Sequence, residues 1–251
     1  MKISRTQRGF TLIELLVVIG IIALLASIAL PAFTGVQIKA AQTKALSNAK
    51  QIGLCCKEFA VDNNGQYPSY TQQNTGGTTT TAAGTGASAV VADSNSAFCQ
   101  LFPQYLQTIS IFYLAKSAYT PGNMQTDPNM SLASQETSPW PLPSGTNEWA
   151  YVTGLYDTSS ASYPLIADGF ATGSTGAPAY SNNENSLGGV WKGQNAIVVF
   201  CDDSARIMKC NNQYMVQGSP QGNLFDTSGQ NGWMGGGTGN TVTVVNPLSG
   251  G

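Results

Sequence analysis

The sequence contains no histidine and little charge of either sign. Without histidine, His-based catalytic triads and His-ligated zinc sites are excluded, and the commonest general base is missing. Charged residues make up only 10% of the 251 residues, well below the roughly 25% of an average soluble domain. A net charge of −2 with no basic cluster predicts no binding to nucleic acid. This composition is more typical of an exported or surface-assembled protein than of a cytosolic enzyme.

Other signatures of site chemistry are missing as well. No CxxC pair occurs among the five cysteines, so zinc-ribbon and thioredoxin-like sites are excluded. An odd number leaves at least one cysteine unpaired if every bridge lies within the chain. There is no GxSxG motif, and no histidine to activate a serine. We therefore predict that the protein is not an enzyme.

One long apolar run stands out against this polar background. Nearly every side chain from Leu12 to Leu30 is apolar, and the run is long enough to cross a bilayer as a helix. Glu14 is its single carboxylate, and an ionised carboxylate in hydrocarbon costs about 2.5–3.5 kcal/mol, which predicts a functional role. Lys2, Arg5 and Arg8 precede the run. By the positive-inside rule, the N-terminus is expected in the cytoplasm and the rest of the chain outside it.

The start of this run resembles a known export signal. A short basic leader ends in Gly9, and Phe10, Thr11, Leu12, Ile13 and Glu14 follow before the apolar helix, which has Pro31 near its end. This pattern resembles the signal of type IV prepilins and of the pseudopilins of type II secretion. The resemblance implies that a prepilin peptidase cleaves the Gly9–Phe10 bond and methylates the new N-terminus of Phe10. It assigns Glu14, Phe10 and Pro31 to filament assembly.

Two plainer interpretations of the run remain open. The first is an ordinary secretory signal peptide, with a small-x-small cleavage site at Ser27-Ile28-Ala29. The second is a signal-anchor helix in which Glu14 reaches the membrane interface. In both alternatives the helix would serve export or anchoring alone.

The apolar helix is predicted to continue as an amphipathic helix over residues 34–64. Apolar side chains recur there every three or four residues, at Ile38, Ala41, Ala45, Ala49, Ile52, Cys56 and Phe59. The stripe predicts that Cys56 is buried. Asn63, Asn64 and Gly65 are suited to a helix C-terminus, and Pro68 prevents continuation. This Asp-Asn-x-Gly-x-Tyr-Pro ending also resembles that of major pseudopilins.

Residues 65–251 are predicted to form an exported α+β region. It begins with a low-complexity loop over 71–92, followed by a short helix and an apolar turn within 94–114. Strands are predicted at 149–153, 163–167 and 241–245, the last at a sheet edge. The clearest hairpin joins 196–201 to 204–209 through Asp202-Asp203. Its expected register pairs 199 with 206 and turns Val198, Phe200, Ala205 and Ile207 toward the long helix, with Cys201 and Cys210 too far apart to bond.

The hairpin carries a second, weaker resemblance. The sequence from Trp191 to Lys209 resembles the end of the prepilin-type processing-associated domain, in which a His, nine residues and Asp-Gly open a hairpin. Lys192 stands at the His position and Asp203 at the Gly position. Because some major pseudopilins bind calcium in C-terminal loops, Asp202 and Asp203 are candidate calcium ligands. Asp157 and Asp168 are the other two acidic residues that we consider for a site. The alternative is that all four aspartates only form turns and caps.

The sequence thus predicts an α+β, pilin-like fold, in which one long helix packs its outer half on an antiparallel sheet. Its expected parts are a leader (1–9), a transmembrane and polymerisation helix (10–33), an amphipathic half (34–64) and the globular region (65–251). The resemblance implies a filament subunit of the inner membrane, with its C-terminal region in the periplasm or outside the cell. Expected partners are copies of itself, other pilin-like subunits, the prepilin peptidase and the inner-membrane assembly platform. The alternative function is that of an exported binding or degradative protein anchored by the helix.

Overall fold

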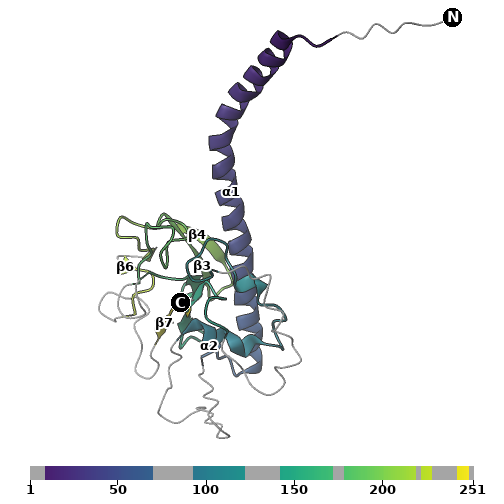
Figure 1. Cartoon of the computed structure of the whole chain (residues 1–251). Coiled ribbons are helices and arrows are strands. Elements are labelled where there is room, and N and C mark those ends of the chain that lie inside the picture. Colours follow the sequence, from purple (N-terminus) through teal and green to yellow (C-terminus); the bar gives the residue numbers. More distant parts are fainter. Residues whose placement is uncertain are drawn as a thin grey trace, which may run out of the picture. The chain divides into compact units, whose positions relative to one another are not determined.

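The computed structural model describes residues 9–69, 93–121, 142–171, 178–218, 222–227 and 242–248 (Figure 1). The expected leader, apart from Gly9, and the low-complexity loop 71–92 lie outside the described residues. The chain divides into two compact units, Met1–Thr43 and Lys44–Gly251. Each unit is described by itself.

Helix α1 spans Leu12–Asp62, 51 residues, and continues without interruption through Pro31. In the first unit, every described side chain from Gly9 to Ala41 is exposed. The segment Leu12–Leu30 has a mean hydropathy of 2.8 and none of it is buried. By length and composition this part of α1 can cross a membrane.

In the second unit α1 has a buried stripe, as the apolar period predicts. Its buried members are Ala45, Ala49, Ile52, Cys56 and Phe59. The prediction extended this stripe too far, because Ile38 and Ala41 are exposed and burial begins only at Gln42. The spacing of apolar residues shows which side of a helix is apolar, whereas the burial of each residue depends on which other elements cover that side. The helix ends as predicted, with Asn64 and Gly65 at positive φ and the Gly65 N–H donating to the Ala60 carbonyl at 2.8 Å.

An antiparallel sheet forms the centre of the second unit. Within the described residues it has five strands in the order β4-β3-β2-β1-β7. Their bounds are β1 Trp149–Thr153, β2 Pro164–Asp168, β3 Asn195–Phe200, β4 Ala205–Lys209 and β7 Thr243–Val245. Strands β5 (Gln217–Gly218) and β6 (Gly222–Asn223) form a separate pair. The predicted α+β arrangement, including the edge position of the last strand, is confirmed.

Short helical turns precede the sheet. They are α2 (Ser94–Phe98) and the 3-10 turns Cys99–Leu101 and Ser110–Phe112, where a short helix and an apolar turn were predicted. Phe98, Phe112 and Tyr151 pack ring against ring in the core. The buried Trp149 indole N–H donates to the Ile111 carbonyl at 3.2 Å. These contacts attach the turns to β1.

The predicted register of the β3–β4 hairpin is wrong by one residue. The structure pairs Val199 with Ala205 and Val198 with Arg206, and the Phe200 N–H donates to the Ser204 carbonyl at 2.9 Å. The connection therefore has three residues rather than two, and its last residue, Asp203, has φ 63°. A left-handed third residue is typical of three-residue hairpin loops, and aspartate tolerates this conformation better than most residues.

The register change alters which side chains of β3 face α1, whereas Ala205 and Ile207 of β4 stay on the predicted face. Val199 lies against α1, since a Cβ built on Gly53 would be 2.9 Å from its Cγ1. Alternation along the strands places Ile197, Val199, Ala205 and Ile207 on this face. The expected assignment of Val198 and Phe200 to it is therefore wrong. Phe200 instead packs under Arg206, whose guanidinium carbon lies 5.4 Å from the ring centroid.

All five cysteines lie in described residues and are free. Cys56 is fully buried, as predicted, and Cys201 and Cys210 form no bond with each other. Cys55 is half-buried, and its thiol donates to the Tyr105 carbonyl at 3.4 Å. Burial raises the pKa of Cys55 to about 11, which keeps this thiol protonated at neutral pH.

Candidate processing and assembly site

The first turn of α1 is closed by two side chains that hydrogen-bond to each other. The Thr11 backbone N–H and its hydroxyl donate to Glu14 Oε2 at 2.9 and 2.7 Å. In return, the Glu14 N–H donates to Thr11 Oγ1 at 3.3 Å. This is a capping box, the Thr-x-x-Glu arrangement that satisfies free N–H groups at a helix start. The Thr11-Leu12-Ile13-Glu14 spacing was readable in the sequence, and our sequence analysis missed it.

The capping box gives Glu14 neutral partners inside the chain. Within the described residues, the carboxylate forms no ion pair. It lies at the positive end of the helix dipole, where a negative charge is favoured. Oε2 of Glu14 is thus held by hydrogen bonds from Thr11. The negative charge of the carboxylate has no cationic partner among the described residues. The arrangement leaves Glu14 able to accept a cationic partner from elsewhere.

The surroundings of Gly9 and Phe10 are open. Phe10 is 75% exposed, and a Cβ built on Gly9 would meet nothing within 4 Å. The structure therefore leaves the Gly9–Phe10 bond accessible to a peptidase. It places Gly9, Phe10 and Glu14 together at the start of α1, whereas Pro31 lies further along the same helix.

The apolar side chains that follow are exposed and have no packing partner among the described residues of the first unit. Leu12, Ile13, Leu16, Ile22, Leu25 and Ile28 are each between 58% and 80% exposed. So large an exposed apolar surface marks contact with a membrane or another protein. A helix satisfies its own backbone hydrogen bonds, so it can exchange one apolar surrounding for another without unfolding.

Replacing Thr11 with valine tests the capping box. The change removes the hydroxyl at nearly constant size, so the first turn of α1 should lose about 1 kcal/mol. Amide hydrogen exchange of residues 12–15 in detergent micelles should become about fivefold faster, whereas the Thr11→Ser variant should keep the native rate. Equal protection in all three proteins would show that the capping box does not stabilise the helix start.

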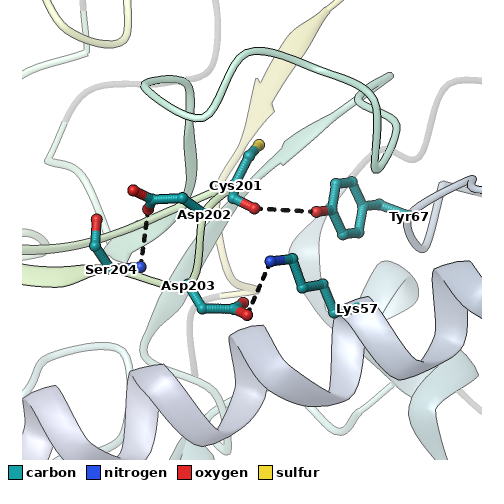
Figure 2. A network of polar contacts seen from close by, with 6 residues as sticks. All are labelled: Lys57, Tyr67, Cys201, Asp202, Asp203 and Ser204. Carbon is teal, nitrogen blue, oxygen red and sulfur yellow. Dashed lines mark hydrogen bonds and ion pairs between the residues drawn. The ribbon is translucent and has the colours of Figure 1, made fainter.

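The candidate calcium ligands at the β3–β4 turn have structural partners (Figure 2). Asp203 Oδ2 forms an ion pair with Lys57 Nζ of α1 at 2.9 Å. Asp202 Oδ1 accepts the Ser204 N–H at 2.8 Å, and hydrogen bonds from Ser204 lower the pKa of Asp202. Within the described residues, no group of three or more Asp, Glu, Cys or His side chains is placed to hold a metal. These contacts fit the alternative interpretation, in which the two aspartates have structural roles in the turn.

The Lys57–Asp203 pair links the hairpin to α1. Tyr67, just after the helix, adds a longer hydrogen bond of 3.5 Å from its hydroxyl to the Cys201 carbonyl (Figure 2). The Asp203→Ala variant should unfold more easily by about 1–2 kcal/mol, because it loses the ion pair and places alanine at positive φ. Asp203→Gly, which loses only the pair, should cost less than 1 kcal/mol. Urea unfolding followed by tryptophan fluorescence measures both, and a larger loss for the glycine variant would contradict this explanation.

Both positions of the weaker resemblance adopt a left-handed backbone. Lys192, at the His position, has φ 55°, and Asp203, at the Gly position, has φ 63°. Lys192 Nζ pairs with Glu184 Oε2 at 2.9 Å, and this contact lowers the pKa of Glu184. The conformation of Asp203 explains why glycine suits that position. The resemblance to the processing-associated domain stays a prediction.

Two carboxyl groups are buried in the sheet. Asp168 Oδ2 accepts the Ile197 N–H at 2.6 Å and the Trp191 indole N–H at 3.1 Å, and the Ser117 hydroxyl donates to Glu148 Oε2. Burial raises the pKa of Asp168 to about 7. Burial and the charge of Asp168 raise the pKa of Glu148 well above its ordinary value. The remaining oxygen of each group has no hydrogen-bond partner among the described residues.

These two acids form no ion pair within the described residues. Asp168 was a candidate in the sequence, whereas nothing in the pattern marked Glu148. A buried carboxyl without a cation stays protonated to higher pH, so these two groups make the stability of the second unit depend on pH.

Known proteins match a part of the chain. The family described as "Prokaryotic N-terminal methylation motif" matches residues 4–30. The type IV major pilin protein PilA of Myxococcus xanthus is 44% identical over 62 residues, 24% of this chain and 28% of the relative. The type II secretion system core protein G of Pectobacterium carotovorum is 42% identical over 66 residues, 26% and 42% of the two chains. The prepilin peptidase-dependent protein D of Escherichia coli is 62% identical over 40 residues, 16% and 27%.

Each of these matches covers less than half the length of the relative, and no solved structure matches the chain significantly. None of the three relatives is named as an enzyme. The matched region contains Gly9, Phe10 and Glu14 together with the exposed apolar part of α1. In its N-terminal methylation motif, its long helix and its α+β fold, the chain is similar to type IV pilins and type II secretion pseudopilins.

Proposed function

We propose that the protein is a structural subunit of a type IV pilus-like or type II secretion pseudopilus filament. The observation that carries the proposal is the fully exposed apolar segment Leu12–Leu30, which lies within the matched methylation motif and contains Glu14 as its only charge. An ordinary anchor needs the apolar surface but not the carboxylate. A subunit that moves from the membrane into a filament needs both. The apolar surface contacts lipid and then other subunits, and the carboxylate pairs with a cation in the filament.

In the proposed mechanism, α1 exchanges lipid for protein. Lipid surrounds the 10–33 segment in the membrane, and the helices of other subunits replace it in the filament. Glu14 then requires a cation in the filament interior, and cleavage after Gly9 supplies one, the amine of Phe10 in its own or a neighbouring subunit. A buried charge that loses its partner costs about 3–5 kcal/mol, so wrong registers between subunits are penalised.

The partners and location follow from this function. Cleavage and methylation of Phe10 require a prepilin peptidase, and extraction from the membrane requires an inner-membrane assembly platform. Other pilin-like subunits share the filament. We propose that α1 passes once through the inner membrane and that the second unit lies in the periplasm or outside the cell. The protein acts as a filament component without enzymatic activity.

Processing at Gly9 is the experiment that tests this function. The mature chain should begin at Phe10 and carry one extra methyl group on its amine, as read by mass spectrometry of the membrane and sheared fractions. A Gly9→Leu variant should accumulate uncleaved in the membrane, with processing reduced at least tenfold. A Ser27→Leu variant, which alters the alternative small-x-small site, should be processed normally. A native chain that begins at Leu30 would show ordinary signal-peptide cleavage and would contradict the proposal.

A further inference from the structure

The exposed positive and negative charges on the α1 segment of the second unit lie at opposite ends of that segment. Lys44 and Lys50 are exposed on its earlier turns, whereas Glu58 and Asp62 are exposed at its end. The last turn of α1 contains no basic residue. Because a helix C-terminus favours cations over anions, these acids are placed against the preference of their own helix. Asp62 Oδ2 accepts the Tyr105 hydroxyl of its own chain at 2.8 Å, so the question of a partner outside the chain concerns Glu58 above all.

The β3–β4 hairpin adds another positive charge, Lys209, near the basic end of this segment. Two contacts fix how it runs along α1: Gly53 lies at Val199, and Lys57 pairs with Asp203. Strand β3 and α1 therefore run in the same direction. Lys209, which pairs with Asn195 at the end of the hairpin away from the turn, lies toward the earlier turns of α1.

The opposite end of the second unit is acidic. Asp157 lies directly at Gly65, just after α1, where a Cβ would come within 2.5 Å of its Oδ1. Asp202 is exposed in the turn next to the Lys57–Asp203 pair. Both groups add negative charge beside Glu58 and Asp62. The second unit is thus basic at one end of its α1 segment and acidic at the other.

Most of these charges have no ion-pair partner in their own chain. Within the described residues, Lys44, Lys50, Lys209 and Glu58 form no salt bridge. By contrast, Lys57 and Lys192 are paired with Asp203 and Glu184 at 2.9 Å. These four unpaired charges lie toward the two ends of the α1 segment.

Exposed apolar side chains accompany the charges at both ends. Leu54 and Val61 are 43% and 79% exposed, and with Glu58 they form one stripe at helical spacing. We define the acidic patch as Leu54, Glu58, Val61 and Asp62. Ile207 is 41% exposed and shares a face of β4 with Lys209. We define the basic patch as Lys50, Ile207 and Lys209.

We propose that the acidic patch of one copy docks on the basic patch of a second copy of this chain. The two patches are complementary in charge, and each combines charge with an apolar contact. A contact between two different patches of identical chains repeats without closing when its rotation does not form a ring, and it then builds a filament. The inference rests on the proposed function, and it adds a second, electrostatic contact to the one made by the apolar segment.

Charge reversal tests this contact in the full-length protein. Glu58→Lys and Lys50→Glu should each lower the yield of sheared filaments roughly tenfold, because like charges then face each other. The double variant, Glu58→Lys with Lys50→Glu, restores complementarity between neighbouring copies and should return the yield to within about twofold of native. Raising the salt concentration should weaken native filaments in the same direction.

Controls separate this contact from folding and from the proposed function. Lys116→Glu makes the same change in net charge on a side chain that is 77% exposed and outside both patches, and it should leave the yield unchanged. A photo-crosslinker at Val61 should join two copies through the basic patch. Unchanged yield in both single variants, no recovery in the double variant, or a crosslink to a different protein would each overturn the inference. Native filaments that persist in those cases leave the proposed function standing, whereas a chain that never enters filaments contradicts the function itself.

Discussion

Replacing Glu14 with leucine is expected to abolish filaments while leaving the protein in the membrane. The substitution makes the Leu12–Leu30 segment more apolar, so insertion should be as efficient as in the native chain or better. Cleavage should continue because Gly9 and Phe10 are unchanged. The yield of sheared filaments should fall at least tenfold, since the amine of Phe10 loses its charged partner and an unpaired buried charge costs several kcal/mol.

The Glu14→Gln variant separates the charge from the capping box. Glutamine can still accept the Thr11 N–H, as in other capping boxes, but it cannot pair with a cation. Our proposal predicts that this variant fails to assemble like the leucine variant, although α1 still begins at Leu12. Normal filaments in Glu14→Gln would show that Glu14 acts only as a helix cap. Methylation of Phe10 should be measured by mass in each variant, so that a processing defect is not mistaken for an assembly defect.

The free energy of unfolding of the second unit is expected to fall as the pH rises from about 4 to about 7. Asp168 has a pKa of about 7 in the folded chain, raised by burial from an ordinary 3.8. Below pH 4 the group is protonated in both states, so its contribution is fully present. Above that pH the unfolded state releases the proton first, and stability declines until the folded group also ionises. The shift corresponds to a loss on the order of 4 kcal/mol.

Glu148 should act in the same direction, because its pKa is raised by burial and by Asp168. Among the neighbouring groups, Tyr180 is affected by both carboxyls and Cys210 by Asp168. Burial raises the pKa of Cys210 to about 12. It also raises the pKa of Tyr180 well above its ordinary value. Neither of them titrates in this pH range, so the decline should come from the two carboxyls.

Urea unfolding at pH 5 and pH 8, followed by tryptophan fluorescence, measures this effect. In the Asp168→Asn variant the carbonyl oxygen can still accept from Ile197 and Trp191, while the titrating group is gone. The pH dependence should therefore become smaller in this variant, and Glu148 should account for what remains. The Asp202→Asn variant, at an exposed carboxyl, should keep the native dependence. A native protein that is more stable at pH 8 than at pH 5 would contradict the assignment.

Local patterns in the sequence predicted most of the fold. The long helix, its end at Asn64-Gly65 and the edge strand β7 follow from apolar period and turn residues, and all three are confirmed. The β3–β4 register was wrong because Asp202-Asp203 has the appearance of a two-residue turn. The register depends on the left-handed conformation of Asp203 and on its pairing with Lys57, a contact between residues 146 positions apart. No local pattern contains that information.

In the candidate site, too, only the residues marked by a local motif could be predicted. Gly9, Phe10 and Glu14 were identified by a contiguous motif, and the matched methylation motif covers them. Asp168 was a candidate, but its burial and its neighbour Glu148 were not identified, since burial of an acid depends on the strands that surround it. The complementary patches were also missed. They combine α1 with β4, and their exposure could be assessed only once the sheet had been placed against the helix.

Photo-crosslinking at Ile19 tests the central claim most directly. Ile19 lies in the middle of the apolar segment and is 57% exposed in the single chain. A photoreactive residue there should give crosslinked copies of this chain in the sheared filament fraction, with each copy beginning at Phe10. In the membrane fraction the same residue should react mainly with lipid. Sheared filaments that lack the chain, or copies that crosslink only to lipid in every fraction, would show that the helix is an anchor and that the protein does not polymerise through it.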